Sequence, residues 1–236
     1  MIHVGAVSTK VRSIESDSID LIFSSPPNAG LKQKNARKQI ETHQYNDWFI
    51  PLAREFLRIL KPSGSMVLNL RAYCQKGERS HHLLELILKL RTLGFLWIDE
   101  YIWEKDQPFQ GEYSRRLPLT YEKMFHFAKT KDYNIYLEQV VDKDGCLPGN
   151  LISQNREKLQ TPLVAFPEQI PEFFLELLTE PGDTVFDPFL WHGGTYQACL
   201  DASRKPIGII DDIHAIDKDL LRKYRVRNKK KYQAND

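Results

Sequence analysis

Two turns in this chain carry residue types that could do chemistry, and the first is Ser25-Pro26-Pro27-Asn28, directly after an apolar run that ends at Ser24. Proline lacks an N–H and has a fixed φ, so consecutive prolines after a strand make a rigid turn whose carbonyls no continuing ladder engages. Such a turn can hold its polar groups for a ligand or a partner. The sequence therefore predicts a functional site here.

The second turn combines an acid with paired glycines. An apolar strand ends at Asp187, and the helical pattern resumes after Gly193-Gly194. A strand, a glycine-containing turn and a helix N-terminus let a ligand approach backbone amides at the carboxyl end of a parallel sheet. One strand later, Asp211-Asp212 could accept the hydroxyls of a ribose. The alternative is a tight turn that uses glycine for its φ freedom.

Two common nucleotide-binding motifs are absent from the sequence. There is no GxxxxGK(S/T) phosphate loop and no GxGxxG dinucleotide motif. A site for a nucleoside-containing ligand at the second turn would therefore be neither a phosphate loop nor a dinucleotide-binding motif.

Positive residues are unevenly placed, although the formal net charge is only +2. A basic tail covers about residues 217–236, and its simplest interpretation is a disordered, solvated end. A basic loop without acids follows the proline turn. It could be a simple solvated loop, but its position beside the proline turn makes a functional role harder to dismiss. Its residues are Lys32, Lys34, Arg37 and Lys38.

Composition favours one domain spanning residues 1–236. With 236 residues, 42% of them hydrophobic, the chain is long enough for one sizeable core. No apolar run approaches the roughly 20 residues of a membrane span, and the N-terminus lacks a signal-peptide pattern. We expect a cytoplasmic protein without membrane contact. Its three cysteines fit neither a disulfide framework nor a zinc site.

Short apolar runs alternate with helical periodicity, which predicts an α/β fold with a largely parallel sheet. The polar stretch from about 129 to 160 is the candidate for a variable loop or small insertion. The expected strands are 2–7, 19–24, 65–70, 95–103, 122–128, 184–187 and 206–210, and the expected helices cover about 48–60, 81–93, 170–178 and 196–202.

Taken in order, these motifs resemble the β class of amino DNA methyltransferases, in which the catalytic motif precedes the cofactor motif. The resemblance spans residues 1 to about 215. It is carried by Gly5-Ala6, the run from Asp20 to Pro27, Lys61-Pro62-Ser63-Gly64, Tyr121-Glu122, the proline-bearing segment 165–171, the run from Gly182 to Phe189, and Gly208 to Asp211.

The resemblance implies a Rossmann-like methyltransferase fold: a mostly parallel sheet with an antiparallel hairpin and helices on both faces. It also implies methyl transfer from S-adenosylmethionine to the exocyclic amino group of cytosine (N4) or adenine (N6) in DNA. The Ser25 side chain and the Pro26 carbonyl would accept hydrogen bonds from that amine, a form of preorganised electrostatic catalysis. Alignment of nitrogen, methyl and sulfur supplies the rest, without metal or covalent intermediate.

Site residues follow from the same resemblance. The catalytic turn comprises Ser25, Pro26, Pro27 and Asn28. The cofactor site comprises Asp187, Pro188, Phe189, Trp191, Gly193, Gly194, Thr195 and Asp211.

The nucleic-acid contacts are also implied by the resemblance. The target nucleotide must leave the duplex, and the basic loop from Lys32 to Lys38 would hold phosphates. Target choice would fall to a small insertion at about 106–160. Because this insertion is short for a recognition domain, the target could be a short site, a single strand or RNA, or a helper subunit could contribute. A homodimer is also open. Ser-Pro-Pro is somewhat commoner among cytosine-N4 enzymes.

Four positions depart from the family pattern. Asn28 stands where an aromatic residue would stack on the extruded base. The stacking contribution of roughly 1–3 kcal/mol is then lost, unless Phe23, Tyr45 or Trp48 supplies it. Trp191 replaces a glycine. In addition, Ala6 replaces an acid, and Ile210 occupies the position of the acid, with Asp211 one place late.

Two interpretations of these departures compete. A divergent enzyme could pack Trp191 on the adenine and use Asp211 or Asp212 for the ribose. Alternatively, the fold serves an inactive DNA-binding or partner-binding module. We favour the enzyme, because Ser25, both prolines and the Gly193-Gly194-Thr195 turn have little structural reason to occur together.

Overall fold

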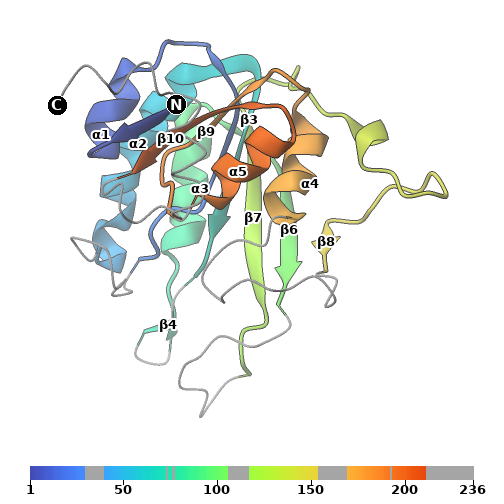
Figure 1. Ribbon diagram of the computed structural model, residues 1–236. Helices are drawn as coiled ribbons and strands as arrows, with labels where there is room; N and C mark the ends of the chain where they lie inside the picture. The colour runs from blue at the N-terminus through green and yellow to red at the C-terminus, as the bar shows by residue number, and fades with distance from the viewer. Residues whose placement is uncertain are drawn as a thin grey trace.

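One eight-stranded sheet organises the molecule, in the order β1-β10-β9-β2-β3-β7-β6-β8 (Figure 1). The computed structural model describes residues 1–29, 40–72, 74–75, 78–105, 117–153, 169–191 and 193–210. The strands are β1 (Ile2–Val4), β2 (Ile19–Ser24), β3 (Leu60–Leu70), β6 (Leu96–Glu104), β7 (Tyr121–Ala128), β8 (Leu151–Ile152), β9 (Thr184–Asp187) and β10 (Lys205–Ile210), with β4 (Cys74–Gln75) and β5 (Glu78–Arg79) in a separate ribbon.

The strands from β1 to β3 in this order run parallel, and β7 then pairs antiparallel with both β3 and β6. The short β8 adds a parallel edge next to β6. This arrangement confirms the predicted mostly parallel sheet with an antiparallel hairpin.

Helices cover both faces of the sheet, as predicted (Figure 1), and each face has its own apolar core. On one face the core includes Phe49 and Phe56 of α2 and Leu86 of α3. On the other it includes Phe174 of α4 and Cys199 of α5. The helices are α1 (Val7–Lys10), α2 (Tyr45–Ile59), α3 (His82–Leu93), α4 (Gln169–Leu178) and α5 (Gly194–Asp201), with short 3-10 turns η1 (Val11–Ser13), η2 (Thr42–Gln44) and η3 (Leu137–Gln139).

The Lys61-Pro62-Ser63-Gly64 sequence ends helix α2 but is not a free turn, because these residues already lie in β3. The register with β2 jumps from Ile19↔Leu60 to Leu21↔Ser65, so the segment forms a bulge. Gly64 permits it: a Cβ there would lie 2.9 Å from the Ile19 carbonyl oxygen and 3.0 Å from that of Asp20.

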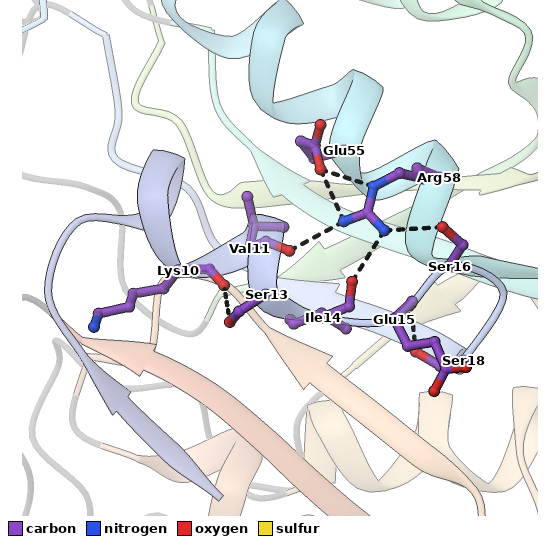
Figure 2. A network of polar contacts seen from close by, with 9 residues as sticks. All are labelled: Lys10, Val11, Ser13, Ile14, Glu15, Ser16, Ser18, Glu55 and Arg58. Atoms are coloured by element: carbon purple, nitrogen blue, oxygen red, sulfur yellow. Dashed lines mark hydrogen bonds and ion pairs between the residues drawn. The ribbon is translucent and has the colours of Figure 1, made fainter.

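The first strand is shorter than the predicted 2–7 run. It ends at Val4 because Gly5 has a φ of +128°, which turns the chain into α1 at Val7. The 3-10 turn η1 that follows α1 is bound to helix α2 by Arg58. Its guanidinium donates to the carbonyls of Val11 and Ile14, as Figure 2 shows.

Part of the predicted insertion at 106–160 falls within the described residues. It contains β7, an arm that projects away from the sheet on the right of Figure 1, and β8. The division into domains stays a prediction. In the described part of the chain, none of the helices is long and apolar enough to cross a membrane.

Candidate functional site

The two predicted turns leave adjacent strands at the point where the strand order reverses. From β2 the chain continues to β3 on one side, and from β9 it continues to β10 on the other. Leu21 pairs with Val185 and Ile22 with Phe186, so the carboxyl ends of β2 and β9 lie side by side. Ligands of open α/β sheets bind at such a switch point.

Asp187, the last residue of β9, receives several hydrogen bonds. Its Oδ1 accepts the Ser24 hydroxyl at 2.5 Å and the Phe189 amide at 3.0 Å, and the Thr195 hydroxyl also donates to the carboxylate. Burial raises the pKa of Asp187 to about 6, while these three donors act in the opposite direction. The side chain is therefore a carboxylate at neutral pH, held by β2, its own turn and α5.

The residues from Asp187 to Thr195 form the donor-side turn. Pro188 is buried, whereas Phe189 and Trp191 are half-buried. Gly193 has a φ of +88° and directly precedes the first turn of α5, a conformation suited to glycine. Thr195 is buried in that first turn. His192 and Asp211 lie outside the described residues.

A side chain at Gly208 of β10 would crowd Leu190. A Cβ at this position would lie 2.6 Å from Leu190 Cδ2, since the Leu190 side chain covers the strand. The Leu190 amide also donates to the Ile209 carbonyl at 3.0 Å. The glycine of the family pattern thus seats the donor-side turn against β10.

The base-side turn, residues 25–28, begins with a half-buried Ser25 and a buried Pro26. The Ser25 hydroxyl donates to Asn69 Oδ1 at 3.1 Å, and Asn69 in turn donates to Met124 Sδ at 3.2 Å. Pro27 and Asn28 are half-buried. Because its hydrogen goes to Asn69, Ser25 keeps its oxygen lone pairs for another donor.

The three aromatic candidates for replacing the missing stacking residue lie in different environments. Phe23 is fully buried, and its ring packs 5.5 Å from that of Phe174 in the α4 core. Tyr45 is fully buried too, and burial raises its pKa. Trp48 is half-buried, with its ring centroid 5.7 Å from that of Phe189. Of the three, Trp48 alone combines exposed surface with a contact to the donor-side turn.

Asp20, the acid at the start of the catalytic motif, lies far from the carboxyl ends and holds the strands together. Its carboxylate accepts Lys61 Nζ at 2.7 Å and the Thr184 amide at 2.9 Å. It therefore links β2 to β3 and β9 at the amino ends of these strands.

Comparison with known proteins gives the same class. A family model described as DNA methylase, of the N6/N4 type, matches residues 19–218. The type II methyltransferase M.PvuII of Proteus hauseri is 24% identical over 86% of this chain and 76% of its own. M.BglII of Bacillus subtilis is 25% identical over 86% of this chain and 63% of its own.

Solved structures show the fold. The PvuII DNA methyltransferase, described as cytosine-N4-specific, superimposes with a TM-score of 0.79 at 24% identity, covering 91% of this chain and 82% of its own. The protein TTHA0409 of Thermus thermophilus, solved in complex with S-adenosyl-L-methionine, gives a TM-score of 0.70 at 22% identity, covering 96% of this chain and 94% of its own.

The chain belongs to the DNA methylase family of N6 and N4 enzymes. It is an S-adenosylmethionine-dependent DNA amino-methyltransferase that transfers a methyl group to the exocyclic amine of cytosine or adenine. Family membership supports the enzyme rather than the inactive module.

Sequence reasoning missed two polar residues at this site, Ser24 and Asn69. Both are buried at or near the carboxyl end of a strand next to the switch point. The available signal was a polar residue inside an apolar run, since buried polar side chains require a partner.

Proposed function

We propose that this enzyme methylates N4 of cytosine, and that the reaction takes place between the base-side turn and the donor-side turn. The observation that carries the proposal is the adjacency of β2 and β9, whose carboxyl ends are joined by the bond from Ser24 to Asp187. The preference for cytosine is supported by Ser-Pro-Pro at residues 25–27 and by the fold shared with a cytosine-N4-specific methyltransferase.

Ser25 and Pro26 act as acceptors for the target amine. A cytosine amine is a weak nucleophile because its lone pair is delocalised into the ring. Two acceptors at its hydrogens favour a more tetrahedral nitrogen and stabilise the positive charge that develops during attack. Ser25 is oriented for this role because its hydroxyl hydrogen is directed to Asn69.

The residues at the donor-side turn fit S-adenosylmethionine, which supplies the electrophilic methyl group when bound. The Asp187 carboxylate suits a cationic ligand, and it retains about one lone-pair site beyond the three bonds that it accepts. The amides at the start of α5, after Gly193, suit the ligand's carboxylate. Phe189 and Trp48 offer half-buried aromatic surface for the adenine ring of the cofactor.

The experiment is methyl transfer from labelled S-adenosylmethionine to DNA, followed by digestion and identification of the methylated nucleoside. Detection of N4-methylcytosine supports the proposal. Detection of N6-methyladenine would show that the target base is adenine and not cytosine. Calorimetric titration with S-adenosylmethionine provides the parallel binding measurement. Transfer to neither base would refute the proposed activity.

Replacing Pro26 by alanine tests the base-side turn within the same assay. The carbonyl remains, but the rigid φ that places it is lost. We expect strongly reduced transfer with unchanged cofactor affinity. Ser13→Ala is a suitable control, because its exposed hydroxyl bonds only locally to the Lys10 carbonyl. A Pro26→Ala enzyme with normal turnover would contradict the assignment.

DNA contacts and assembly are part of the proposal. We assign phosphate binding to Lys32, Lys34, Arg37 and Lys38, which lie outside the described residues, so a weaker salt dependence of DNA binding is expected when they are replaced. Whether target choice uses one chain, a homodimer or a helper subunit is tested by sedimentation with and without DNA.

A further inference from the structure

Ser24 lies at the junction of the two turns but belongs to neither. It is the last residue of β2, it is fully buried, and it directly precedes Ser25. Its hydroxyl donates to Asp187 Oδ1 at 2.5 Å across a sequence separation of 163 residues. A short hydroxyl-to-carboxylate bond of this kind is stronger than a neutral one.

The carboxylate that Ser24 reaches is itself tied to the donor-side turn. Its other donors are the Phe189 amide, inside that turn, and the Thr195 hydroxyl, in the first turn of α5. One carboxylate thus connects the ends of β2 and β9, the donor-side turn and the start of α5. Of these donors to Asp187, the Ser24 hydroxyl is the one that comes from β2, the strand that leads into the base-side turn.

We propose that Ser24 is a positioning residue for methyl transfer, which fixes the base-side turn relative to the donor-side turn through Asp187. The inference rests on the proposed function, because it assumes that Ser25 and Pro26 hold the amine. In-line transfer requires close alignment, and a displacement of about 1 Å can reduce a rate by about 10²-fold. Since Ser24 is covalently joined to Ser25, its anchor sets where Ser25 and Pro26 lie.

The same bond favours the ionised form of Asp187. A donor to a carboxylate stabilises the charge, so removing the Ser24 hydroxyl raises the pKa of Asp187 further above its ordinary value. Within the described residues, the titratable group coupled to Asp187 is the buried Cys199 thiol of α5, whose pKa is raised mainly by burial. That thiol stays neutral over the working range, so it adds no second ionisation beside Asp187.

The test compares Ser24→Ala, Ser24→Thr and Ser65→Ala with the wild type in the labelled-methyl assay. Ser65 is the matched control: it is buried in the neighbouring strand β3, and its hydroxyl bonds to His126 Nε2 at 2.9 Å, away from the two turns. All assays are run at a temperature and over a pH range in which circular dichroism shows each variant folded. For Ser24→Ala we expect a kcat lower by about 10- to 100-fold and an unchanged KM for S-adenosylmethionine above the acid limb.

Two further readouts separate positioning from general destabilisation. The acid limb of kcat/KM should move to higher pH in Ser24→Ala but not in Ser65→Ala. Ser24→Thr, which keeps the hydroxyl, should recover most of the rate. Wild-type kcat and pH profile in Ser24→Ala, or equal losses in Ser24→Ala and Ser65→Ala, would overturn the inference.

Failure of the proposed function gives a different result. If the wild type binds S-adenosylmethionine but transfers no methyl group, calorimetry replaces the kinetic readout: the pH midpoint of cofactor binding must rise in Ser24→Ala, and an unchanged midpoint overturns the inference. If the wild type binds no S-adenosylmethionine, both proposals fall.

Discussion

At the scale of single residues, the site is defined by the acceptors to which two serine hydroxyls donate their hydrogen bonds. Ser24 gives its hydrogen to Asp187, and Ser25 gives its hydrogen to Asn69. Adjacent serines are thereby committed to opposite sides of the switch point. In each case the acceptor fixes the direction of the hydroxyl hydrogen, and with it the direction of the oxygen lone pairs.

The Ser25–Asn69 pair leads to a prediction about coupling. Ser25→Ala should lower kcat by about 10²-fold, by analogy with the loss of one preorganised hydrogen-bonding group. Asn69→Leu should lower kcat by about tenfold, because the Ser25 hydroxyl loses its fixed direction, a contribution near that of one hydrogen bond. Cofactor affinity should not change in either variant.

The double variant provides the decisive comparison. If Asn69 acts only through Ser25, the double variant should be as slow as Ser25→Ala alone, and the two effects should not add. Fully additive losses in single-turnover rates would contradict this relation.

At the scale of elements, the bulge at the start of β3 sets the register of the strand that carries Asn69. Gly64→Ala places a Cβ 2.9 Å from a β2 carbonyl oxygen, so the backbone must shift. We expect a loss of about 1–3 kcal/mol in unfolding free energy, the range for an overpacked site. Urea unfolding measures it.

Gly149→Ala is the matched control, since a Cβ there has only the Leu151 amide nitrogen nearby, at 3.9 Å. Its stability should remain close to that of the wild type. Equal stability of the Gly64 and Gly149 variants would show that the bulge tolerates a side chain.

Two arginines tie elements together to different degrees. Arg204 is buried, and its guanidinium donates to the carbonyls of Leu175 and Thr179 at the end of α4 and to that of Ala202 after α5. Arg204→Met leaves these carbonyls without this donor. We expect a loss of about 2–3 kcal/mol in unfolding free energy, because the acceptors are buried.

Arg58→Met removes the Arg58 contacts drawn in Figure 2 and serves as the comparison. The Arg58 side chain is 33% exposed, so water can replace part of the network, and its ion pair with Glu55 has little value. Its loss in unfolding free energy should be about 1 kcal/mol or less. A larger loss for Arg58→Met than for Arg204→Met would contradict the role of burial.

At the scale of the whole molecule, His126 should make stability depend on pH. The side chain is fully buried in β7, and burial lowers its pKa to about 4. The unfolded chain takes up a proton near the ordinary pKa, about 6.5, so unfolding is favoured as the pH falls from there toward 4. At about pH 5, this histidine should have reduced the free energy of unfolding by roughly 2 kcal/mol.

His126→Gln tests this dependence, because glutamine does not titrate and can still bond to the Ser65 hydroxyl. Urea unfolding at about pH 7.5 and about pH 5 should show a smaller loss in the variant than in the wild type. Identical losses would show that other groups account for the acid sensitivity.

Much of the fold could be predicted because its signals are local. The strands Ile19–Ser24 and Thr184–Asp187 have the predicted bounds, since each apolar run ends at a proline turn. The helices on both faces follow from apolar periodicity and glycine breaks, such as Gly94 with a φ of +120° after α3. The bulge at Lys61–Gly64 could not be predicted, because it depends on how closely Gly64 approaches β2.

By itself, the sequence determined the order of elements and the two turns, because proline, glycine and apolar runs act through their immediate neighbours along the chain. Only the tertiary structure decided which side chains meet across the switch point: Ser24 with Asp187, Ser25 with Asn69, and Trp48 with Phe189. Those contacts join residues from different strands and helices, and strand pairing and packing create them.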